Sequence, residues 1–588
     1  MPRIAILHKD RCNPVGCGGY LCIRVCPVNM QGKQCKTIDP VDKKVKIDEK
    51  LTTSACSICQ NACPFGAIEM INLPDELTTQ PVHTYPPNGL HLYDLPLPQF
   101  GKVVGIVGRN GIGKSTAIKI LAGVLKPNLG TEKEASVEDL LKYYKGSTGQ
   151  IFFEKLKKGE IKVSYKPQQV EYIPKSAKGT VKELLRKVDE KDGFDEVVAF
   201  LELENVLDTN IDKISGGELQ RVAIAATALK KANVYIFDEP TSYLDIGQRL
   251  RAARFIRSLV NDSTAVLVVE HDLVILDFMT DIMHIMYGNE GAYGIVSQPK
   301  PSRNGINTYL EGFIKEQKMR FRDHEIKFMT APPSASKKII PLVSWKNVEK
   351  KLGKFSVKVI NGCIGNSEVV GILGENGTGK TTFVRILANE LTKDSGELTE
   401  KVTVSYKPQY LAAESDETVG AYLQEANAKY SVQLIRPLDL EHHMNKPLNK
   451  LSGGELQRVF IAHCLGKEAD VYLLDEPSAY LDVEQRLAVA KVIKEVATMR
   501  EKSILVVDHD IVFIDYLSDR LMVFDGEPAI RGEAHGPIAM VEGMNMFLKL
   551  IDITMRRDSE SYRPRINSPD SRLDREQKES GHLYYNKT

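Results

Sequence analysis

The chain has 588 residues, several times the length of a usual domain, so it must divide into several hydrophobic cores. Its 42% hydrophobic and 26% charged residues are ordinary for a globular protein and exclude a chain that is disordered throughout. The 78 basic and 77 acidic side chains nearly cancel. The chain therefore has no overall charge that would attract nucleic acid or membranes, and any such contact must be made by a local patch. Because the sequence contains neither a long apolar run nor a signal peptide, we expect a cytoplasmic protein with no membrane partner.

The N-terminal region carries all but two of the ten cysteines, a clustering that in a cytosolic chain favours metal binding over disulfides. Most of them fall in two runs that each end in Cys-Pro: Cys12, Cys17, Cys22 and Cys26, then Cys56, Cys59 and Cys63. Such paired runs are typical of two-cluster ferredoxins, in which the last cysteine of one run ligates the cluster of the other. This pattern predicts two four-iron clusters, one held by the first three cysteines and Cys63, the other by Cys26, Cys56 and Cys59.

The second cysteine run is one residue short. Ferredoxin spacing places a cysteine at position 53, where this chain has Thr53. Cys35 stands off the pattern, and it either supplies the missing thiolate or is a free thiol on a loop. Without it, the second cluster has three protein ligands or is a three-iron species. Zinc is the competing metal, because Cys-x₂-Cys pairs are common to both kinds of site.

Beyond the cysteines, the same string of motifs appears twice. Each half contains a Gly-rich loop after an apolar run, a YKPQ segment, an SGGELQRV segment, an apolar strand ending in Asp-Glu-Pro and a strand followed by His-Asp. Each half is therefore predicted to be one domain of the same fold. The Gly-rich loops follow a strand and open a helix, which is the context of a nucleotide-binding P-loop. Their predicted ligand residues are Gly108, Asn110, Gly111, Gly113, Lys114, Ser115 and Thr116, and Gly374, Asn376, Gly377, Gly379, Lys380, Thr381 and Thr382.

The P-loops predict how ATP and Mg²⁺ are held. Backbone N–H groups at a helix start surround the phosphates, while Lys114 and Lys380 neutralise their charge. The hydroxyls of Ser115 and Thr381 are expected to hold Mg²⁺.

The Asp-Glu pairs predict that both halves hydrolyse ATP. Asp238 and Asp475 suit coordination of the metal and its water, while Glu239 and Glu476 can polarise a water molecule against the γ-phosphate. Adenine needs an aromatic platform, for which Tyr85, Trp345 and Phe355 are the candidates, although each ring could equally belong to a core.

From about residue 75 to 550 these motifs resemble the ABC ATPase superfamily. The resemblance implies Q-loop glutamines that contact Mg²⁺, D-loop aspartates and catalytic switch histidines at Gln168, Gln409, Asp245, Asp482, His271 and His509. It also identifies the signature residues as Ser215, Gly216, Gly217 and Glu218, and Ser452, Gly453, Gly454 and Glu455. In that superfamily the signature of one cassette caps ATP on the P-loop of the other, so Ser452 should face Lys114 and Ser215 should face Lys380. A helix start suits this role, since it offers backbone donors and a favourable dipole to phosphate.

The expected organisation is a multidomain α/β protein with an N-terminal ferredoxin-like α+β iron-sulfur domain followed by two ABC-type nucleotide-binding domains. The expected boundaries are 1–75, 76–298, 299–340 for a hinge, 341–545, and 546–588 for a C-terminal hinge and tail. An insertion in the first half, near 131–158, is predicted to form two short amphipathic helices flanking KGSTG. Its lysines suit contacts with RNA phosphates, and the alternative is a solvated charged face.

The whole arrangement resembles one family, the archaeal and eukaryotic ribosome-recycling ATPases, also called RNase L inhibitors. That resemblance implies a monomer that pairs its own cassettes and splits ribosomes after termination or stalling, together with a release factor or Pelota-like factor. It also implies later residence on the small ribosomal subunit, with contacts to rRNA. A transporter ATPase subunit and an ATP-driven electron carrier are the alternatives. The lack of a spanning segment weighs against the first, and the lack of a flavin or substrate motif weighs against the second.

Overall fold

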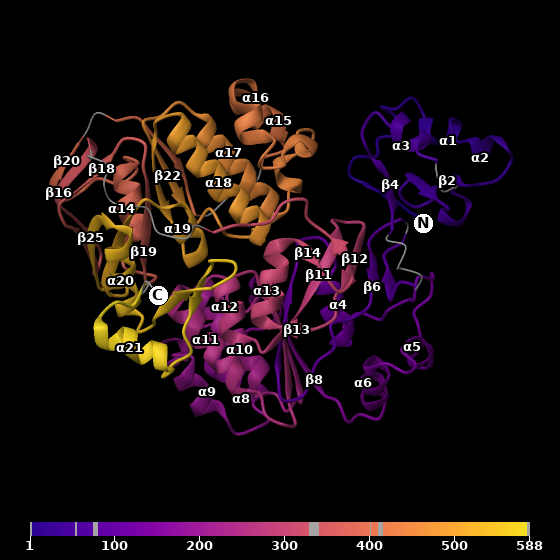
Figure 1. Ribbon diagram of the computed structural model, residues 1–588, viewed down its shortest axis with the longest axis horizontal. Helices are drawn as coiled ribbons and strands as arrows, with labels where there is room; N and C mark the ends of the chain where they lie inside the picture. The colour runs from indigo at the N-terminus through magenta and orange to yellow at the C-terminus, as the bar shows by residue number, and fades with distance from the viewer. Residues whose placement is uncertain are drawn as a thin grey trace.

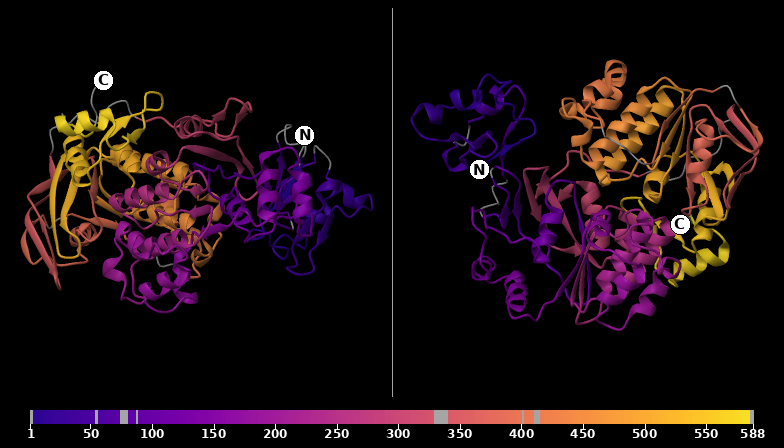
Figure 2. Two further views of the ribbon diagram at one scale, coloured as in Figure 1. Left: turned by 90° about the horizontal axis from the view of Figure 1, so that it is seen from below. Right: turned by 180° about the vertical axis from the view of Figure 1, so that it is seen from behind.

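The computed structural model describes residues 3–52, 56–73, 80–86, 88–328, 340–399, 402–409 and 415–584. Thr53, where the ferredoxin spacing is broken, lies outside these residues. The described chain forms a small N-terminal domain, two larger α/β domains that lie side by side, and a C-terminal segment laid across both (Figure 1, Figure 2). No helix in these ranges has the length and the apolar character that crossing a membrane requires.

The N-terminal domain is closed by an antiparallel pair of strands from its two ends. Strand β1 (Arg3–Leu7) pairs with β4 (Ile68–Asn72), and the hairpin β2 (Lys36–Ile38) and β3 (Val45–Ile47) lies between them in the chain. The short helices are α1 (Leu21–Arg24), α2 (Pro27–Met30) and α3 (Ile58–Ala62). Cys26 is the N-cap of α2, with a proline at the first helical turn. Cys63 is the C-cap of α3, so each Cys-Pro step borders a short helix.

The first α/β domain is built on a mixed sheet in the order β5-β6-β12-β11-β7-β10-β9-β8, with β13 beside β11. Its strands are β5 (His83–Thr84), β6 (His91–Tyr93), β7 (Val103–Val107), β8 (Val163–Lys166), β9 (Val234–Asp238), β10 (Ala265–Val269), β11 (Ile282–Asn289), β12 (Tyr293–Val296) and β13 (Lys300–Pro301). Strands β11, β7, β10, β9 and β8 run parallel. Every residue of β7, β9 and β10 is buried, as expected of parallel strands covered on both faces.

Helices cover this sheet and also form the insertion. They are α4 (Lys114–Leu121), α5 (Val137–Tyr143), α6 (Thr148–Lys157), α7 (Ile173–Ser176), α8 (Val181–Val188), α9 (Phe194–Phe200), α10 (Gly216–Leu229), α11 (Ile246–Ser258) and α12 (Leu273–Met279). Helices α5 and α6 form the helix-loop-helix at the edge of the domain (Figure 1). Because the carboxyl ends of parallel strands meet at one edge, the loops after β7, β9 and β10 gather there.

The second α/β domain repeats the plan in the order β18-β16-β17-β25-β24-β19-β23-β22-β21, with β20 beside β16. Its strands are β16 (Pro341–Leu352), β17 (Phe355–Val359), β18 (Gly362–Gly365), β19 (Val369–Gly374), β20 (Ser395–Leu398), β21 (Val404–Lys407), β22 (Val471–Asp475), β23 (Ser503–Val507), β24 (Arg520–Glu527) and β25 (Arg531–Ala539). The helices are α14 (Lys380–Leu387), α15 (Val419–Tyr422), α16 (Gln424–Tyr430), α17 (Gly453–Gly466), α18 (Val483–Met499), α19 (Ile511–Leu517) and α20 (Met540–Leu550). The parallel run β24-β19-β23-β22-β21 matches β11-β7-β10-β9-β8, so the duplicated motifs fold into duplicated domains.

The link between the halves and the C-terminal segment are both structured where they are described. They contain α13 (Ser302–Glu311), β14 (Phe313–Ile314), β15 (Met319–Arg320), β26 (Met555–Arg557), β27 (Pro564–Ile566) and α21 (Arg572–Ser580). Asp558 is buried and accepts hydrogen bonds from Arg303 Nε at 2.8 Å and from Asn307 Nδ2 at 3.0 Å, both on α13. Arg565 Nε donates to Asp277 of α12 at 2.6 Å. The tail is therefore fastened to the first domain by buried charges.

Candidate active sites and cysteine sites

The first P-loop joins β7 to α4 at the carboxyl edge of the sheet. Gly111 and Gly113 have φ angles of 73° and 96°, in the left-handed region that favours glycine, and they turn the loop into the helix start. Lys114 is the first helical residue and is buried, and its Nζ donates to the carbonyl oxygens of Gly108 at 2.9 Å and Arg109 at 2.6 Å. The cation therefore lies inside the loop that is expected to hold the phosphates, and burial lowers its pKa.

The second P-loop has the same geometry. Gly377 and Gly379 have φ angles of 77° and 98°. Lys380 Nζ donates to the carbonyl oxygens of Gly374 at 3.0 Å and Glu375 at 2.6 Å. Both lysines begin a helix, so the loop's N–H groups and the positive end of the helix dipole favour an anion at the same point.

The two glutamates expected to activate water lie directly after β9 and β22. Glu239 and Glu476 have φ angles of 47° and 48°, an uncommon conformation for a residue with a side chain. The backbone holds each glutamate in place. The N–H of Glu239 donates to the carbonyl oxygen of Val269 at 2.9 Å, and that of Glu476 donates to the carbonyl oxygen of Val507 at 2.8 Å. Strain at matching positions in both halves is typical of residues whose placement serves catalysis.

The side chains of these glutamates are positioned by the predicted Q-loop and switch residues. Gln168 Nε2 donates to Glu239 Oε1 at 2.8 Å, and His271 Nε2 lies 3.4 Å from the same oxygen. The second half repeats this arrangement. Gln409 Nε2 donates to Glu476 Oε1 at 2.7 Å, and His509 Nε2 lies 3.6 Å from the same oxygen. The structure thus brings together three residue types that stand far apart in each half of the sequence. Each glutamine uses its NH₂ group here, and its carbonyl oxygen is the atom suited to a metal.

Two buried residues that the sequence analysis did not single out hold the backbone of the first glutamate. Lys166 Nζ donates to the carbonyl oxygens of Asp238 at 2.9 Å and Glu239 at 3.0 Å. Gln220 Nε2 donates to the same backbone carbonyl oxygen of Glu239 at 2.6 Å. Burial lowers the pKa of Lys166 to about 8. Lys407 and Gln457 make the corresponding bonds in the second half. The signal was present in the sequence, because both residues recur within YKPQ and SGGELQRV.

The aspartates at the ends of β9 and β22 fit a magnesium site. Asp238 and Asp475 are each 1% exposed, and neither carboxylate oxygen of either residue has a hydrogen-bond partner among the described residues. Burial raises the pKa of Asp238 to about 6 and also raises that of Asp475. The hydroxyls of Ser115 and Thr381 lower the pKa of Asp238 and Asp475 respectively, but burial outweighs them. A buried carboxylate beside a P-loop hydroxyl supplies the oxygen ligands that Mg²⁺ prefers, and the bound ion would neutralise phosphate charge.

Each P-loop is also in contact with the opposite half of the chain. Asp482 Oδ2 accepts from the backbone N–H of Asn110 at 2.9 Å, and Asp245 Oδ2 accepts from that of Asn376 at 3.0 Å. Arg109 adds an ion pair with Glu484, with 3.3 Å between Nε and Oε2. The two halves are therefore paired head to tail within one chain.

The signature segments open helices α10 and α17. Ser215 and Ser452 are the N-caps, and each forms a capping box with Glu218 or Glu455 three residues later. Glu290 lies against the first P-loop, because a Cβ on Gly111 would be 2.5 Å from its Cγ. The two capping boxes give the signature serines and glutamates a structural role as helix caps. The facing of Ser452 and Lys114, and of Ser215 and Lys380, stays a prediction.

One lysine connects the second signature to the N-terminal domain. Lys446 Nζ lies 3.0 Å from Asp10 Oδ2 and 3.3 Å from Glu455 Oε1. His443 Nδ1 lies 3.4 Å from the same oxygen of Glu455. The capping glutamate of α17 is thus shared between its own helix and a bridge to the cysteine-rich domain.

The structure separates the three candidate adenine platforms. Trp345 is 1% exposed and packs edge-on against Phe383 in the core, with ring centroids 5.1 Å apart, so it offers no free face and the expectation for this residue is corrected. Tyr85 is 40% exposed, and its hydroxyl lies 3.3 Å from Thr116 Oγ1 in the first P-loop helix. Phe355 lies beside the second P-loop, because a Cβ on Gly379 would be 3.0 Å from its ring. Tyr85 and Phe355 remain the candidates.

The cysteines of the N-terminal domain fall into two neighbourhoods. Burial, together with the nearby thiols of Cys12, Cys63 and Cys17, raises the pKa of Cys22 to about 11. These four cysteines are the ones predicted for the first cluster, and Cys59, predicted for the second, also lies close enough to act on Cys22. Among the described residues, no three donor side chains already stand together as a closed metal cage.

The second neighbourhood contains Cys35, which is 1% exposed and is therefore not a loop thiol open to solvent. Burial raises the pKa of Cys35 to about 11, and the thiols of Cys26 and Cys59 act in the same direction. Lys36 Nζ donates to Cys26 Sγ at 3.4 Å and approaches Cys35 Sγ at 4.0 Å. Buried thiols gathered around a cation suit an anionic thiolate site such as an iron-sulfur cluster.

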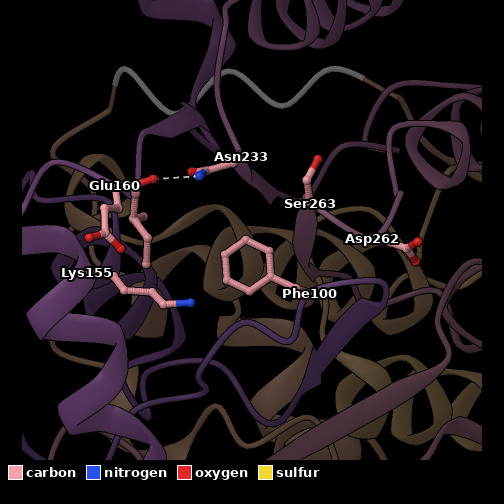
Figure 3. Close-up of a pocket in the computed structure, with 7 residues that line it drawn as sticks. Phe100, Lys155, Glu160, Asn233, Asp262 and Ser263 are labelled. Atoms are coloured by element: carbon pink, nitrogen blue, oxygen red, sulfur yellow. Dashed lines mark hydrogen bonds between the residues drawn. The ribbon is translucent and has the colours of Figure 1, made fainter.

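A separate cavity lies at the other edge of the first sheet. It measures about 360 Å³ and is lined by Phe100, Lys155, Glu160, Ile161, Asn233, Asp262 and Ser263 (Figure 3). Asn233 precedes β9 and Ser263 precedes β10, so this cavity is at the amino ends of the strands, whereas the P-loop is at their carboxyl ends. It lies at the junction of the insertion with the domain, at the opposite end of the strands from the P-loop.

Comparison with protein families and curated relatives agrees with this geometry. The ABC transporter family model matches residues 97–242 and 357–479, and a model described as a possible Fer4-like domain in RNase L inhibitor matches residues 2–34. An uncharacterized ABC transporter ATP-binding protein of Methanocaldococcus jannaschii is 49% identical, over 99% of this chain and 97% of its own. Translation initiation factor RLI1 of Saccharomyces cerevisiae is 43% identical, over 99% of this chain and 98% of its own.

Solved structures match along the chain as well. A structure titled as a model of ribosome-bound archaeal Pelota and ABCE1 matches with a TM-score of 0.93 and 50% identity, over 99% of both chains. A complex of archaeal ribosomal stalk protein aP1 with the archaeal ribosome recycling factor aABCE1 matches with a TM-score of 0.82 and 52% identity, over 86% of this chain and 99% of that one. Full-length relatives at this identity, together with two complete ATPase sites and a cysteine-rich N-terminal domain, show that the chain belongs to the RNase L inhibitor family of twin-cassette ABC ATPases.

Proposed function

We propose that this protein is an ATP-driven ribosome-recycling factor that splits ribosomes into subunits after termination or stalling. The observation that carries the proposal is the reciprocal contact of each D-loop aspartate with the P-loop of the other half, through Asp482 to Asn110 and Asp245 to Asn376. ATP bound at either P-loop would lie at the junction of the halves and favour their closure. Hydrolysis would remove that attraction, so the nucleotide cycle becomes a mechanical cycle of the whole chain.

The proposed chemistry follows from the residues at each site. Lys114 and Lys380 neutralise phosphate charge, while Glu239 and Glu476 orient a water molecule for attack on the γ-phosphate. The glutamine and histidine that contact each glutamate hold its carboxylate in place. Mg²⁺, held by the P-loop hydroxyl, the Asp238 or Asp475 carboxylate through water, and the Q-loop glutamine, would supply electrostatic stabilisation of the transferred phosphoryl group.

The proposed cofactors include two iron-sulfur clusters of the four-iron type in the N-terminal domain. The two cysteine neighbourhoods support this number, since Cys22 lies near Cys12 and Cys63 while Cys35 lies near Cys26. Because the domain carries no flavin or substrate motif, we assign the clusters a structural and mechanical role. They would give a small domain the rigidity that its limited core cannot supply.

The proposed partners are ribosomal subunits, the small one above all, with rRNA and a release factor or Pelota-like factor. The support is the relation to an archaeal protein whose structure is titled as ribosome-bound with Pelota, and to one titled as a recycling factor in complex with a stalk protein. The protein would act in the cytoplasm as a monomer, because its two halves already pair within the chain.

Sucrose-gradient sedimentation tests the proposed function. Intact ribosomes, a Pelota-like factor and the purified chain should yield free subunits when ATP is supplied, and the chain should stay on the small subunit with a non-hydrolysable ATP analogue. The Glu239→Gln, Glu476→Gln double variant should remain bound to the small subunit even with ATP. Intact ribosomes after prolonged incubation with ATP and factor, under conditions where the chain hydrolyses ATP, would contradict the proposal.

A further inference from the structure

One buried cysteine of the N-terminal domain, Cys35, stands outside both cysteine runs. We propose that Cys35 is the fourth protein ligand of the second iron-sulfur cluster, beside Cys26, Cys56 and Cys59, and that Lys36 is the built-in N–H donor to the thiolates of that cluster. This inference rests on the proposed pair of clusters and deepens it, because it assigns the ligand that sequence spacing leaves open.

The first step of the argument is that Cys35 is placed in the site by the fold. The N–H of Asp48 donates to the carbonyl oxygen of Cys35 at 2.7 Å. One residue on, Lys36 N–H donates to Asn29 Oδ1 at 2.9 Å, and Asn29 Nδ2 returns a bond to the Lys36 carbonyl oxygen at 2.8 Å. Asn29 lies on α2, which begins directly after Cys26. The backbone of Cys35 and Lys36 is therefore held close to a predicted cluster ligand.

The second step is burial. Cys26, Cys35 and Cys59 are 1%, 1% and 2% exposed. A lone structural cysteine is often buried as a small hydrophobic residue, but it then packs among apolar side chains. Here the neighbours of Cys35 include two other sulfurs and an ammonium group. Those surroundings are unsuitable for a hydrophobic thiol and suitable for a metal-bound thiolate.

The third step is the charge of Lys36. Its side chain is 4% exposed, and burying an ammonium ion without a negative partner costs several kcal/mol, on the order of the penalties measured for buried charges. Among the described residues, the side-chain atoms that its Nζ contacts by hydrogen bonding are the sulfurs of Cys26 and Cys35. A four-iron cluster with four thiolates carries net negative charge and accepts N–H···S hydrogen bonds. The buried lysine is thus explained by an anionic cluster, and not by neutral thiols.

Iron content and spectroscopy of the anaerobically purified full chain test the ligand. Wild type should contain about eight irons per chain, as two four-iron clusters require. Cys35→Ser should lose about one of them and show a three-iron signal by electron paramagnetic resonance, whereas the control Cys363→Ser should match wild type. In the Cys35→Ser background, Thr53→Cys should restore the lost iron, because it completes the second run.

Each result leads to a decision. If Cys35→Ser keeps full iron and the wild-type spectrum, Cys35 is not a ligand. If that variant does not fold, Mössbauer spectra of wild type decide, since a non-sulfur ligand at one iron of the second cluster would overturn the assignment and all-sulfur coordination would support it. A wild-type chain that binds no iron would instead refute the proposed clusters themselves.

Lys36 has its own test. Lys36→Met should keep the iron of both clusters but shift the reduction potential of one of them to a more negative value, because a positive charge and an N–H···S bond favour the reduced cluster. Lys36→Arg should stay closer to wild type, and Lys33→Met, which changes a nearby exposed lysine, should show no shift. An unchanged potential in Lys36→Met would remove the lysine from the cluster environment.

Discussion

At the scale of single residues, each predicted active site contains a glutamate held in an unusual backbone conformation. Glu239→Gln or Glu476→Gln should abolish hydrolysis at its own site and leave ATP bound, because the phosphate loop is untouched and only water activation is lost. The double variant should fall to background phosphate release while it retains labelled ATP in a filter assay. Normal turnover by the double variant would exclude both glutamates from the mechanism.

The buried lysine of the YKPQ motif carries a second prediction at this scale. Lys166 Nζ bonds the carbonyl oxygens of Asp238 and Glu239, so Lys166→Met should misplace the glutamate and reduce kcat by about 10-fold to 100-fold, the range seen when supporting shells are removed. KM for ATP should change little, because the P-loop keeps its contacts. The measurement is steady-state ATPase in a Glu476→Gln background, which isolates the first site.

The matched control is Lys162→Met, which replaces an exposed lysine just before the same strand, β8. It should leave kcat unchanged. An equal loss in both variants, or a rise of KM without a fall of kcat in Lys166→Met, would contradict a positioning role for Lys166.

At the scale of elements, the insertion is both an appendage and part of a core. Leu140, Tyr144, Phe152 and Phe153 are buried in the same hydrophobic cluster as the central strands of the first sheet. Deleting 131–158 would therefore expose apolar core surface. Weaker ribosome binding by such a variant could then result from misfolding as well as from lost contacts. The lysines of the insertion are the better target, and Lys157 is already paired with Glu138 at 2.5 Å.

We predict that replacing the exposed lysines Lys142, Lys145 and Lys158 by alanine preserves basal ATPase and weakens attachment to ribosomal subunits. Loss of three phosphate contacts should also reduce the steepness with which binding falls as salt rises. Binding is measured by co-sedimentation at several salt concentrations. The control replaces Lys178, Lys182 and Lys187, exposed lysines elsewhere in the same domain. Equal binding by the two triple variants would assign the insertion lysines to a solvated face.

Much of the architecture could be predicted at this scale because strong motifs constrain local structure. The P-loop, the Asp-Glu strand end and the capped signature helix each have a short sequence pattern with a physical reason behind it, and the fold places them as that pattern requires. Trp345 was harder to assign, because an aromatic residue before a P-loop can face either ATP or the core, and sequence spacing does not distinguish the two. Contacts between segments far apart in the chain, such as that of Arg109 with Glu484, could not be predicted, because they produce no pattern of neighbouring residues in the sequence.

At the scale of the whole molecule, the C-terminal segment is bound to α13 through Asp558 and to α19 of the second domain through the ion pair of Arg557 with Asp515. Burial raises the pKa of the Asp558 carboxyl, but hydrogen bonds from the N–H groups of Ser561 and Glu560, and from Asn307 and Arg303, outweigh burial and hold the pKa well below its usual range. A carboxyl with a lowered folded-state pKa stabilises the fold above its unfolded pKa, which is about 3.9, and that stabilisation is lost as pH falls further.

Asp558→Asn should therefore destabilise the chain at neutral pH by about 3 kcal/mol, the order of magnitude for breaking a buried charge pair. The thermal unfolding midpoint of the variant should lie below that of wild type from pH 7 to pH 5, and the difference should shrink below about pH 4. Asp552→Asn is the control, since the Asp552 side chain is 85% exposed. A difference between Asp558→Asn and wild type that grows as pH falls would contradict the assigned charge state.

The lysine bridge between the N-terminal domain and the second signature has a consequence that follows from linkage alone. Lys446 contacts both Asp10 of the N-terminal domain and the capping glutamate of α17, so the docking of that domain and the state of that helix share a coupling free energy. A partly exposed ion pair contributes up to about 1 kcal/mol, which corresponds to about a fivefold change in an equilibrium constant. By reciprocity, if Ser452 caps ATP on the first P-loop, ATP there must alter docking of the domain by the same factor by which docking alters ATP affinity. The position of the cysteine-rich domain would then depend, through the single ammonium group of Lys446, on whether ATP is bound at the first P-loop.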